Sequence, residues 1–307
     1  MKVGIIDCGT NTFNILIAEV DEEKNWKVVF ENKLPVKLGA GGFDSKTIVP
    51  SRFLRGLDAM TCHANNLKNF ECEKVFAFAT SAIREAKNGP DFVKTVKEVT
   101  GIEIAVIDGN REAELIWSGI RQTIDLGTEP SLIMDIGGGS TEFIIANQTE
   151  IFWKKSYLLG VSRLHERVEP ADRIKHDDIN KLRRILELEL TELKAALEQF
   201  PCKQLVGSSG SFDTVYAMYL HQGGRLEGSH YELCNEIAMS AFPTIHQWLM
   251  GSTLAERLKH KAIPSVRAEY MPLASYMIKY ILEIGQFERM YHSSYALKEG
   301  AIADALR

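Results

Sequence analysis

Two short segments of the sequence place an aspartate directly before a glycine-containing turn. Residues 133–146 read IMDIGGGSTEFIIA, and residues 5–18 read IIDCGTNTFNILIA. At an offset of 128 residues, Asp7 aligns with Asp135 within two apolar runs joined by a short polar stretch. Glycines at such a turn expose backbone N–H groups and let an oxygen-rich ligand approach closely. The repeat therefore indicates two similar domains, each with a phosphate-binding turn.

Two better-known phosphate loops do not fit the stretch GGGST at residues 137–141. A Walker loop has a lysine after its last glycine, whereas Ser140 follows here, and a Rossmann turn opens a helix, whereas TEFIIA favours a strand. The remaining interpretation is strand, tight turn, strand. One isolated copy could equally be a hairpin turn closed by a capping aspartate, but two copies favour the phosphate loop.

A divalent cation would link the aspartates to a phosphate. Mg²⁺ prefers one or two carboxylates together with water and phosphate oxygens. Asp7 and Asp135 each end a predicted strand at the turn, so the sequence predicts a site for Mg²⁺, or another divalent cation, beside them.

A third glycine loop follows in GSSGSFDTV, residues 207–215. Gly207 and Gly210 surround two serines just before a predicted helix, and a helix N-terminus attracts anions. Strand–loop–helix junctions often carry glycine and serine, so this loop alone is weak evidence for phosphate binding. It supports that interpretation only together with the other two loops.

The bulk composition limits the classes of protein that need to be considered. A chain of 307 residues with 45% hydrophobic and 25% charged residues suits about two globular domains. The net charge of −5 indicates no nucleic-acid or membrane partner, and an anionic substrate would need a local group of basic residues. We expect no signal peptide, because the start MKVGIIDCGT lacks a long apolar core and a cleavage site. We expect no membrane span, because no apolar run approaches roughly 18 residues. The five cysteines form no CxxC pair, which predicts reduced thiols in a cytoplasmic protein.

The alternation of strand-forming runs with helical periodicity predicts an α/β fold. Asn110 is expected to cap a helix over residues 111–124, and one long helix is expected over residues 178–199. Beyond residue 221 the chain is expected to be mostly helical. Strands are predicted at residues 3–7, 14–20, 26–30, 74–79, 102–107, 132–135, 141–146, 149–155 and 204–207, and further helices at residues 50–70, 90–100 and 212–221.

Two hairpin phosphate loops, a duplicated α/β domain and a third glycine loop together resemble the actin-like ATPase and sugar-kinase superfamily, whose domains have a ribonuclease H-like fold. Longer motifs resemble one family within it, the Ppx–GppA exopolyphosphatases and guanosine pentaphosphate phosphatases. These motifs are ATSAIREAKNG, IDGNREAELIWSGI, LIMDIGGGSTEFIIA, YLLGVSRLHE and VGSSGSFDTV, in this order along the chain. The similarity is collinear over nearly the whole chain.

This resemblance implies two actin-like domains, residues 1–122 and 123–294, with an active-site cleft between them. A helix over residues 295–307 is expected to pack back on the first domain. Longer relatives carry a C-terminal HD-type domain, which is not expected here. His176-Asp177 lies in a charged run that suits a solvated helix start. Without that domain, we expect a preference for short polyphosphate chains.

The family cleaves a terminal phosphate with a Mg²⁺-assisted water, and the resemblance implies the residues responsible. Glu112 would be the catalytic base, with Glu142 close to the water and the metal. The ordinary alternatives are that Glu112 complements a helix dipole and that Glu142 faces solvent on a strand. Arg111 stands where many relatives have a second acid, so a more positive field around Glu112 is expected. The metal ligands would be Asp7, Asp135 and Glu142.

The resemblance also implies a set of phosphate-binding residues. Arg84 is expected to contact phosphate through its planar guanidinium, and its ordinary alternative is an ion pair with Glu85 or Glu112. Arg163 and Arg267 are weaker candidates, since either could form a structural ion pair. The full expected set is Thr10, Asn11, Thr12, Arg84, Gly137, Gly138, Gly139, Ser140, Thr141, Gly207, Ser208 and Gly210.

The leading functional prediction is an exopolyphosphatase that releases orthophosphate from the ends of inorganic polyphosphate. The nearest alternative hydrolyses guanosine pentaphosphate to the tetraphosphate, and a guanine pocket, which the sequence does not reveal, would separate the two. A kinase of the broader superfamily would need an acceptor site and an adenine pocket, and the sequence context of Glu112 and Arg84 argues against it. The non-enzyme alternative is a nucleotide- or alarmone-binding sensor, which gains little from a water-activating acid. A homodimer is plausible.

Overall fold

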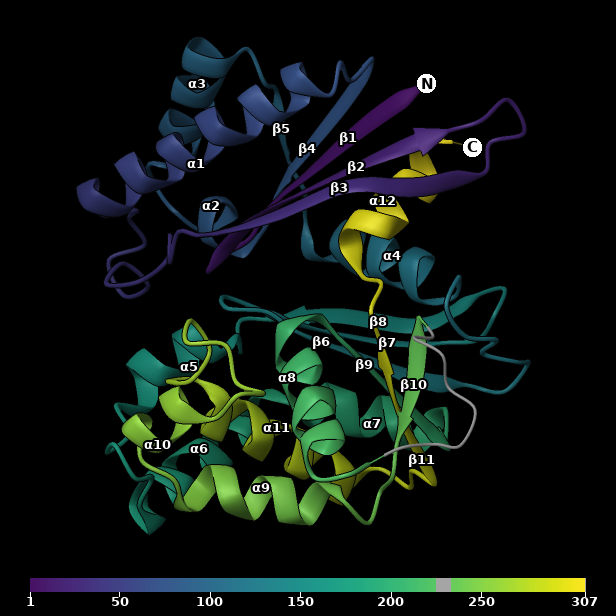
Figure 1. Ribbon diagram of the computed structural model, residues 1–307. Helices are drawn as coiled ribbons and strands as arrows, with labels where there is room; N and C mark the ends of the chain where they lie inside the picture. The colour runs from purple at the N-terminus through teal and green to yellow at the C-terminus, as the bar shows by residue number, and fades with distance from the viewer. Residues whose placement is uncertain (225–232, 307) are drawn as a thin grey trace. The chain divides into compact units, whose positions relative to one another are not determined.

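The chain divides into two compact units. The computed structural model describes residues 1–224 and 233–306. Unit 1 comprises Met1–Gly119 together with the chain from Leu297 onward, and unit 2 comprises Ile120–Ala296. Both units are α/β, as the sequence predicted (Figure 1).

Unit 1 is built on a five-stranded mixed sheet in the order β3-β2-β1-β4-β5. β1 pairs antiparallel with β2 and parallel with β4. Most residues of β1 and β2 are buried, which matches their nearly continuous apolar sequences. The strands are β1 (Lys2–Cys8), β2 (Thr12–Val20), β3 (Trp26–Pro35), β4 (Lys74–Ala79) and β5 (Ile104–Val106).

Helices lie on both faces of this sheet, with α1 and α3 on one face and α4 and α12 on the other (Figure 1). α1 has a proline in its first turn, and α3 ends at Gly101, whose φ of 75° is readily adopted only by glycine. The helices are α1 (Pro50–Asn69), α2 (Ser81–Arg84), α3 (Gly89–Thr100), α4 (Gly109–Ile120) and α12 (Leu297–Ala305).

Unit 2 repeats the strand arrangement of unit 1. Its sheet has the order β10-β11-β9-β6-β7-β8, and β6 pairs antiparallel with β7 and parallel with β9. The series β8-β7-β6-β9 thus corresponds to β3-β2-β1-β4, so the sequence repeat reflects a repeated fold. The strands are β6 (Ser131–Ile136), β7 (Thr141–Ala146), β8 (Ile151–Tyr157), β9 (Gln204–Ser208), β10 (Cys234–Ile237) and β11 (Arg289–Ser293).

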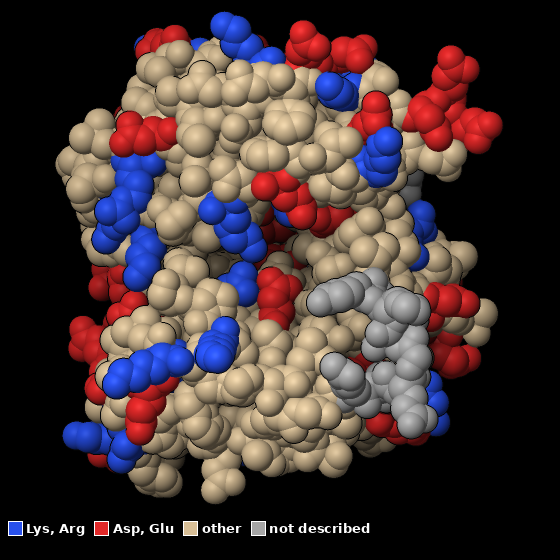
Figure 2. Space-filling view, viewed as in Figure 1, with Lys and Arg blue, Asp and Glu red and all other residues tan. Residues whose placement is uncertain are grey.

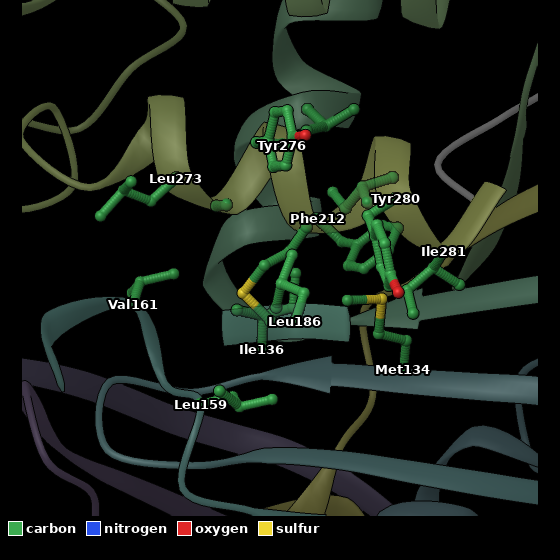
Figure 3. Close-up of a cluster of buried hydrophobic side chains, with 14 of the residues drawn as sticks. Met134, Ile136, Leu159, Val161, Leu186, Phe212, Leu273, Tyr276, Tyr280 and Ile281 are labelled. Atoms are coloured by element: carbon green, nitrogen blue, oxygen red, sulfur yellow. The ribbon is translucent and has the colours of Figure 1, made fainter. Parts of the chain in front are cut away.

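A large apolar core lies between this sheet and its helices (Figure 3). Met134 and Ile136 of β6 belong to the same cluster as Leu186 of α6, Phe212 of α8 and Tyr280 of α11. This packing anchors the strand that ends at the second glycine loop. The helices are α5 (Val161–Val168), α6 (His176–Glu189), α7 (Thr191–Gln199), α8 (Ser209–His221), α9 (Phe242–Gly251), α10 (Leu254–Lys259) and α11 (Met271–Ile284).

Two expectations about these elements were wrong. The long helix expected over residues 178–199 is two helices, because the chain leaves helical geometry at Leu190. Asn110 lies inside α4, which begins one residue earlier, and the carboxylate of Asp108 accepts from Arg111 N–H instead. The described chain beyond residue 221 is mostly helical, as expected. It also contributes β10 and β11, whose short polar sequences lack a continuous apolar run.

The charge on the surface is mixed. Lys and Arg as well as Asp and Glu side chains occur on the face of each unit shown in Figure 2. In the part of the chain that the structure describes, none of the helices combines the length and the apolar character that crossing a membrane requires.

Candidate active site

The two glycine turns share the same backbone geometry. Gly9 N–H donates to Thr12 O at 3.1 Å, and Gly137 N–H donates to Ser140 O at 3.0 Å, again 128 residues apart. A Cβ on either glycine would lie 3.0 Å from that carbonyl oxygen, which is tighter than nearly all real contacts. The duplicated sequence therefore folds into a duplicated tight turn.

The start of α5 holds the carbonyl side of the second turn. Val161 N–H donates to Gly137 O at 3.0 Å, and Ser162 N–H donates to Gly138 O at 2.9 Å. Gly160 lies so close that a Cβ there would clash with the backbone of Gly138. The motif YLLGVSRLHE is thus explained by its support of the loop.

Two side chains expected to bind phosphate also donate hydrogen bonds that fix this loop. Arg163 Nε donates to Gly139 O at 3.0 Å, and Thr141 Oγ1 donates to Leu159 O at 3.1 Å. The hydroxyl proton of Thr141 is therefore engaged within the protein. Arg163 acts on the loop through its guanidinium.

α5 and Arg163 donate hydrogen bonds to the carbonyl groups of residues 137–139. The N–H groups of the same loop are the other polar groups of its backbone. Among the described residues, the N–H groups of Gly138 and Gly139 have no protein acceptor. Backbone N–H groups that lack a protein acceptor are ordinarily satisfied by water or a ligand. Successive N–H groups of this kind form a concave anion-binding surface.

Unit 1 holds its turn in the same way with a different segment. Leu38 N–H donates to Thr10 O at 2.7 Å, and the N–H groups of Val36 and Lys37 both donate to Asn11 O at 2.9 Å. This segment follows β3, just as α5 follows the corresponding strand β8. In both units the chain after the third strand binds the carbonyl groups of the turn.

The acids of unit 2 are buried together. Asp135 and Glu142 are register partners on β6 and β7, with exposed fractions of 5% and 1%. Ser156 donates to Glu142 Oε1 at 2.7 Å, and the hydroxyls of Ser208 and Ser209 donate to Asp135 Oδ2 at 2.9 and 2.7 Å. Glu142 does not face solvent, so that alternative for Glu142 is wrong. Asp135 also joins the second glycine loop to the third.

Ser209 carries backbone strain at this junction. Its φ is 63°, in the left-handed region that non-glycine residues rarely adopt. Such strain costs about 1 kcal/mol or more and is concentrated at functional sites. The hydrogen bond to Asp135 helps to hold Ser209 in this conformation.

In unit 1 the corresponding pair is Asp7 and Asn14, which are also register partners. Asn14 Nδ2 donates to Asp7 Oδ2 at 2.9 Å. Burial raises the pKa of Asp7 above its ordinary value, although the Asn14 hydrogen bond opposes this. Asn14 Oδ1 is buried and has no hydrogen-bond partner within the described chain.

These donors fit a hard divalent cation by type. The carboxylates of Asp7, Asp135 and Glu142 and the orphaned amide oxygen of Asn14 are oxygen ligands of the kind that Mg²⁺ prefers. Residues 1–224 and 233–306 contain no group of three or more His, Cys, Asp or Glu side chains arranged to hold a metal.

Glu112 lies in the first turn of α4 with an exposed fraction of 6%. Arg84 Nη1 donates to Glu112 Oε2 at 2.9 Å and to Ile107 O at 2.9 Å, and its Nε lies 3.4 Å from Glu85 Oε1. The ordinary ion pairs considered for Arg84 are therefore both present. They orient the buried carboxylate and offset the cost of burying its charge.

Arg111, beside Glu112, has partners of its own. It forms ion pairs with Asp304 of α12 and with Glu114, the latter at 3.3 Å. Gly300 of α12 lies so close to α4 that a Cβ would clash with Leu115 O. α12 therefore packs on the helix that carries Glu112, and carboxylates balance the charge of Arg111.

The third glycine loop combines packing and charge. A Cβ on Gly207 would clash with the Phe212 ring, so this glycine is required by packing. A Cβ on Gly210 would clash with the guanidinium of Arg267, which therefore lies directly on the loop backbone. Asp213 contacts Arg267 and is paired with His292, and neither Asp213 nor His292 is among the site residues predicted from the sequence.

The fold of the chain matches solved structures of two-domain, actin-like α/β proteins. A crystal structure of an exopolyphosphatase from Cytophaga hutchinsonii has a TM-score of 0.95 and 33% identity, covering 100% of this chain and 98% of that one. A crystal structure of the Aquifex aeolicus member of the Ppx/GppA family has a TM-score of 0.81 and 22% identity, covering 100% and 98% of the two chains. The second similarity concerns the fold alone.

Sequence comparison identifies the family. The pattern of the Ppx/GppA phosphatase family matches residues 16–307, so the chain belongs to this family. The Guanosine-5'-triphosphate,3'-diphosphate pyrophosphatase of Photobacterium profundum is 24% identical over 301 residues, which are 98% of this chain and 58% of that protein. The chain thus spans less than two thirds of this relative. Family and fold are as the sequence predicted, and the roles of the site residues stay predictions.

Proposed function

We propose that the protein is an exopolyphosphatase that hydrolyses the terminal phosphate of inorganic polyphosphate to orthophosphate. The observation that carries this proposal is the second glycine loop. Its carbonyl groups are engaged by α5 and Arg163, and the N–H groups of Gly138 and Gly139 have no acceptor within the described chain. The buried pair of Asp135 and Glu142 lies on the two strands that the loop connects. The solved exopolyphosphatase at 33% identity supports the same activity.

In the proposed reaction, Glu112 orients a water and takes its proton as the water attacks the terminal phosphorus. The bond from this phosphorus to the bridging oxygen breaks, and that oxygen leaves on the shortened polyphosphate chain. A positioned carboxylate contributes typically about 10²–10⁴-fold in such a role. Phosphoryl transfer depends mainly on positioning and charge neutralisation. The glycine-loop N–H groups would stabilise charge on the phosphate oxygens. Arg84 would orient Glu112 and contact phosphate through its guanidinium.

Asp7, Asp135 and Glu142 would hold Mg²⁺, which would neutralise phosphate charge when it is bound. Asn14 would orient the Asp7 carboxylate through its amide, and Ser208 and Ser209 would orient that of Asp135. Each of these hydrogen bonds is made to Oδ2 of the aspartate. The proposed donors are therefore already fixed by the protein.

The second candidate is hydrolysis of guanosine pentaphosphate to the tetraphosphate. The Photobacterium profundum relative, named as a pyrophosphatase of that nucleotide, favours it at 24% identity. Both substrates end in a phosphate chain, so the same loops and acids would serve either reaction.

The test is orthophosphate release with Mg²⁺ from tripolyphosphate and from guanosine pentaphosphate, measured in parallel. Wild type is compared with Glu112→Gln and with the control Glu114→Gln, a more exposed glutamate on the same helix. We expect release from tripolyphosphate that falls about 10²–10⁴-fold in Glu112→Gln and is nearly unchanged in Glu114→Gln. Release from the nucleotide alone would favour the second candidate, and release from neither would contradict both.

A further inference from the structure

We propose that Asp213 and His292 form a positioning pair that holds the guanidinium of Arg267 against the third glycine loop, where it binds a phosphate of the substrate. This inference rests on the proposed function and assigns roles to two residues that sequence analysis did not identify. All three residues belong to unit 2.

Arg267 lies directly on the loop. The space that a Cβ on Gly210 would need is occupied by three atoms of the Arg267 guanidinium. Glycine is therefore required at 210 to let the charged group reach the loop backbone. The Arg267 side chain is 20% exposed, so part of it lies at the protein surface.

The hydrogen bonds of Arg267 are long. Its Nη1 and Nη2 lie 3.4 Å from Asp213 Oδ2, and Nη1 lies 3.3 Å from Thr214 Oγ1. Arg257, by contrast, is 3% exposed and donates at 2.6 Å to two backbone carbonyl groups. Arg257 has the contacts of a structural arginine, whereas Arg267 is oriented and keeps donor capacity for an anion.

Asp213 bridges two cationic or donor groups with its two oxygens. Oδ2 faces Arg267, and Oδ1 lies 3.0 Å from His292 Nε2. Asp213 is in the first turns of α8, three residues after Gly210, so its position follows that of the loop. A carboxylate bound on both sides has one orientation, and this fixes the guanidinium plane.

His292 is itself firmly held. Its exposed fraction is 6%, and its ring stacks on Tyr216 with centroids 4.9 Å apart and planes 12° apart. On β11 it is the register partner of Gly207, which begins the third loop. Within the described residues, His292 Nδ1 has no hydrogen-bond partner, so the imidazole ring makes its polar contact with Asp213 through Nε2. The sheet thereby sets the position of Asp213.

The experiment measures tripolyphosphate binding to the whole protein by calorimetry, together with kcat and KM for phosphate release. Arg267→Ala and Asp213→Ala should each weaken binding about tenfold or more, since each removes a charged contact or its support. The double variant should bind no more weakly than Arg267→Ala alone, because Asp213 acts through Arg267. KM should rise more than kcat falls.

His292→Phe retains a ring to stack on Tyr216 but removes the donor to Asp213, and we expect about three- to tenfold weaker binding. His292→Gln restores a donor near Nε2 and should recover most of the loss. Asp213→Asn, which keeps the shape of the side chain, replaces Asp213→Ala if that variant does not fold. Thermal unfolding of each variant identifies folding defects.

Additive losses in the double variant, or wild-type binding in His292→Phe, would overturn the proposal. A wild type that does not bind tripolyphosphate would do so too. A wild type that binds tripolyphosphate but releases no phosphate would contradict the proposed hydrolysis instead. The tripolyphosphate affinities of the two single variants and the double variant would then still decide whether Asp213 acts through Arg267.

Discussion

Asp135 and Glu142 lie directly opposite each other on adjacent antiparallel strands, and both carboxylates are buried. Like charges in this relation destabilise a sheet. At the same two positions of unit 1, Asp7 faces Asn14 and accepts a hydrogen bond from it. Unit 2 thus has a second acid where unit 1 has an amide. A costly pair of this kind is typical of a functional site.

Glu142→Gln should therefore stabilise the fold and impair the reaction. The amide oxygen can still accept from Ser156, while the repulsion with Asp135 is removed. We expect the free energy of unfolding to rise by about 1 kcal/mol and Tm to rise by about 2–4 °C. Phosphate release should fall about 10²-fold or more. Differential scanning calorimetry and a phosphate assay check this, with exposed Glu150→Gln as control. A lower Tm with full activity would contradict it.

Gly160→Ala should damage the second glycine loop. The added Cβ would clash with backbone atoms of Gly138 and Gly139, which cannot give way as a flexible side chain can. We expect the KM for tripolyphosphate to rise about tenfold or more, with a loss of about 1–3 kcal/mol in stability. The control is Gly251→Ala, where a Cβ meets open space. An unchanged KM for Gly160→Ala would show that the loop does not bind substrate.

Gly300→Ala should affect Glu112 through α4, the helix on which Gly300 packs. A Cβ at Gly300 would clash with Leu115 O and so displace one helix from the other. We expect about 1–3 kcal/mol of destabilisation and a fall in kcat larger than the rise in KM. Steady-state kinetics and thermal unfolding measure both, with the partly exposed Ala305→Ser as control. A normal kcat in a destabilised Gly300→Ala protein would show that the packing of α12 stabilises the fold but does not affect catalysis.

The sequence was most informative where the signal is local. The repeat around Asp7 and Asp135 predicted two strand–turn–strand units, because an apolar run, an aspartate and a glycine occur within a few residues. The family motifs added Glu112 and Arg84, which the structure brings together at 2.9 Å. The two turns could thus be predicted from short sequence patterns, whereas Glu112 and Arg84 were found through the family motifs.

What could not be predicted depends on contacts distant in sequence. A lone glutamate in TEFIIA gave no sign that Glu142 would be buried against Ser156. Nothing in the sequence indicated that the chain after β3 and β8 would bind the carbonyl groups of the two turns. Asp213 and His292 are 79 residues apart, and β11, which carries the histidine, lacks the apolar run by which strands are identified.

His246 should make stability depend on pH in a defined range. Burial lowers its pKa from 6.5 to about 4, with Lys279 lowering it further and Glu283 opposing the shift. Its Nδ1 lies 3.1 Å from Ser275 Oγ, within the packing of α9 on α11. The folded protein therefore holds this ring in its neutral form where the unfolded chain would already be charged.

As the pH falls below 6.5, the unfolded chain takes up a proton at His246 before the folded protein does. Stability from this site is thus fully present above about pH 7 and is lost progressively down to about pH 4. Because the ring is only partly buried, we expect a loss of about 1–2 kcal/mol after allowance for solvent screening. Urea unfolding at pH 7.5 and pH 4.5 should show a smaller pH dependence in His246→Gln than in wild type, whereas exposed His176→Gln should match wild type. Equal pH dependence in wild type and His246→Gln would mean that the ring is charged in the folded protein as readily as in the unfolded chain.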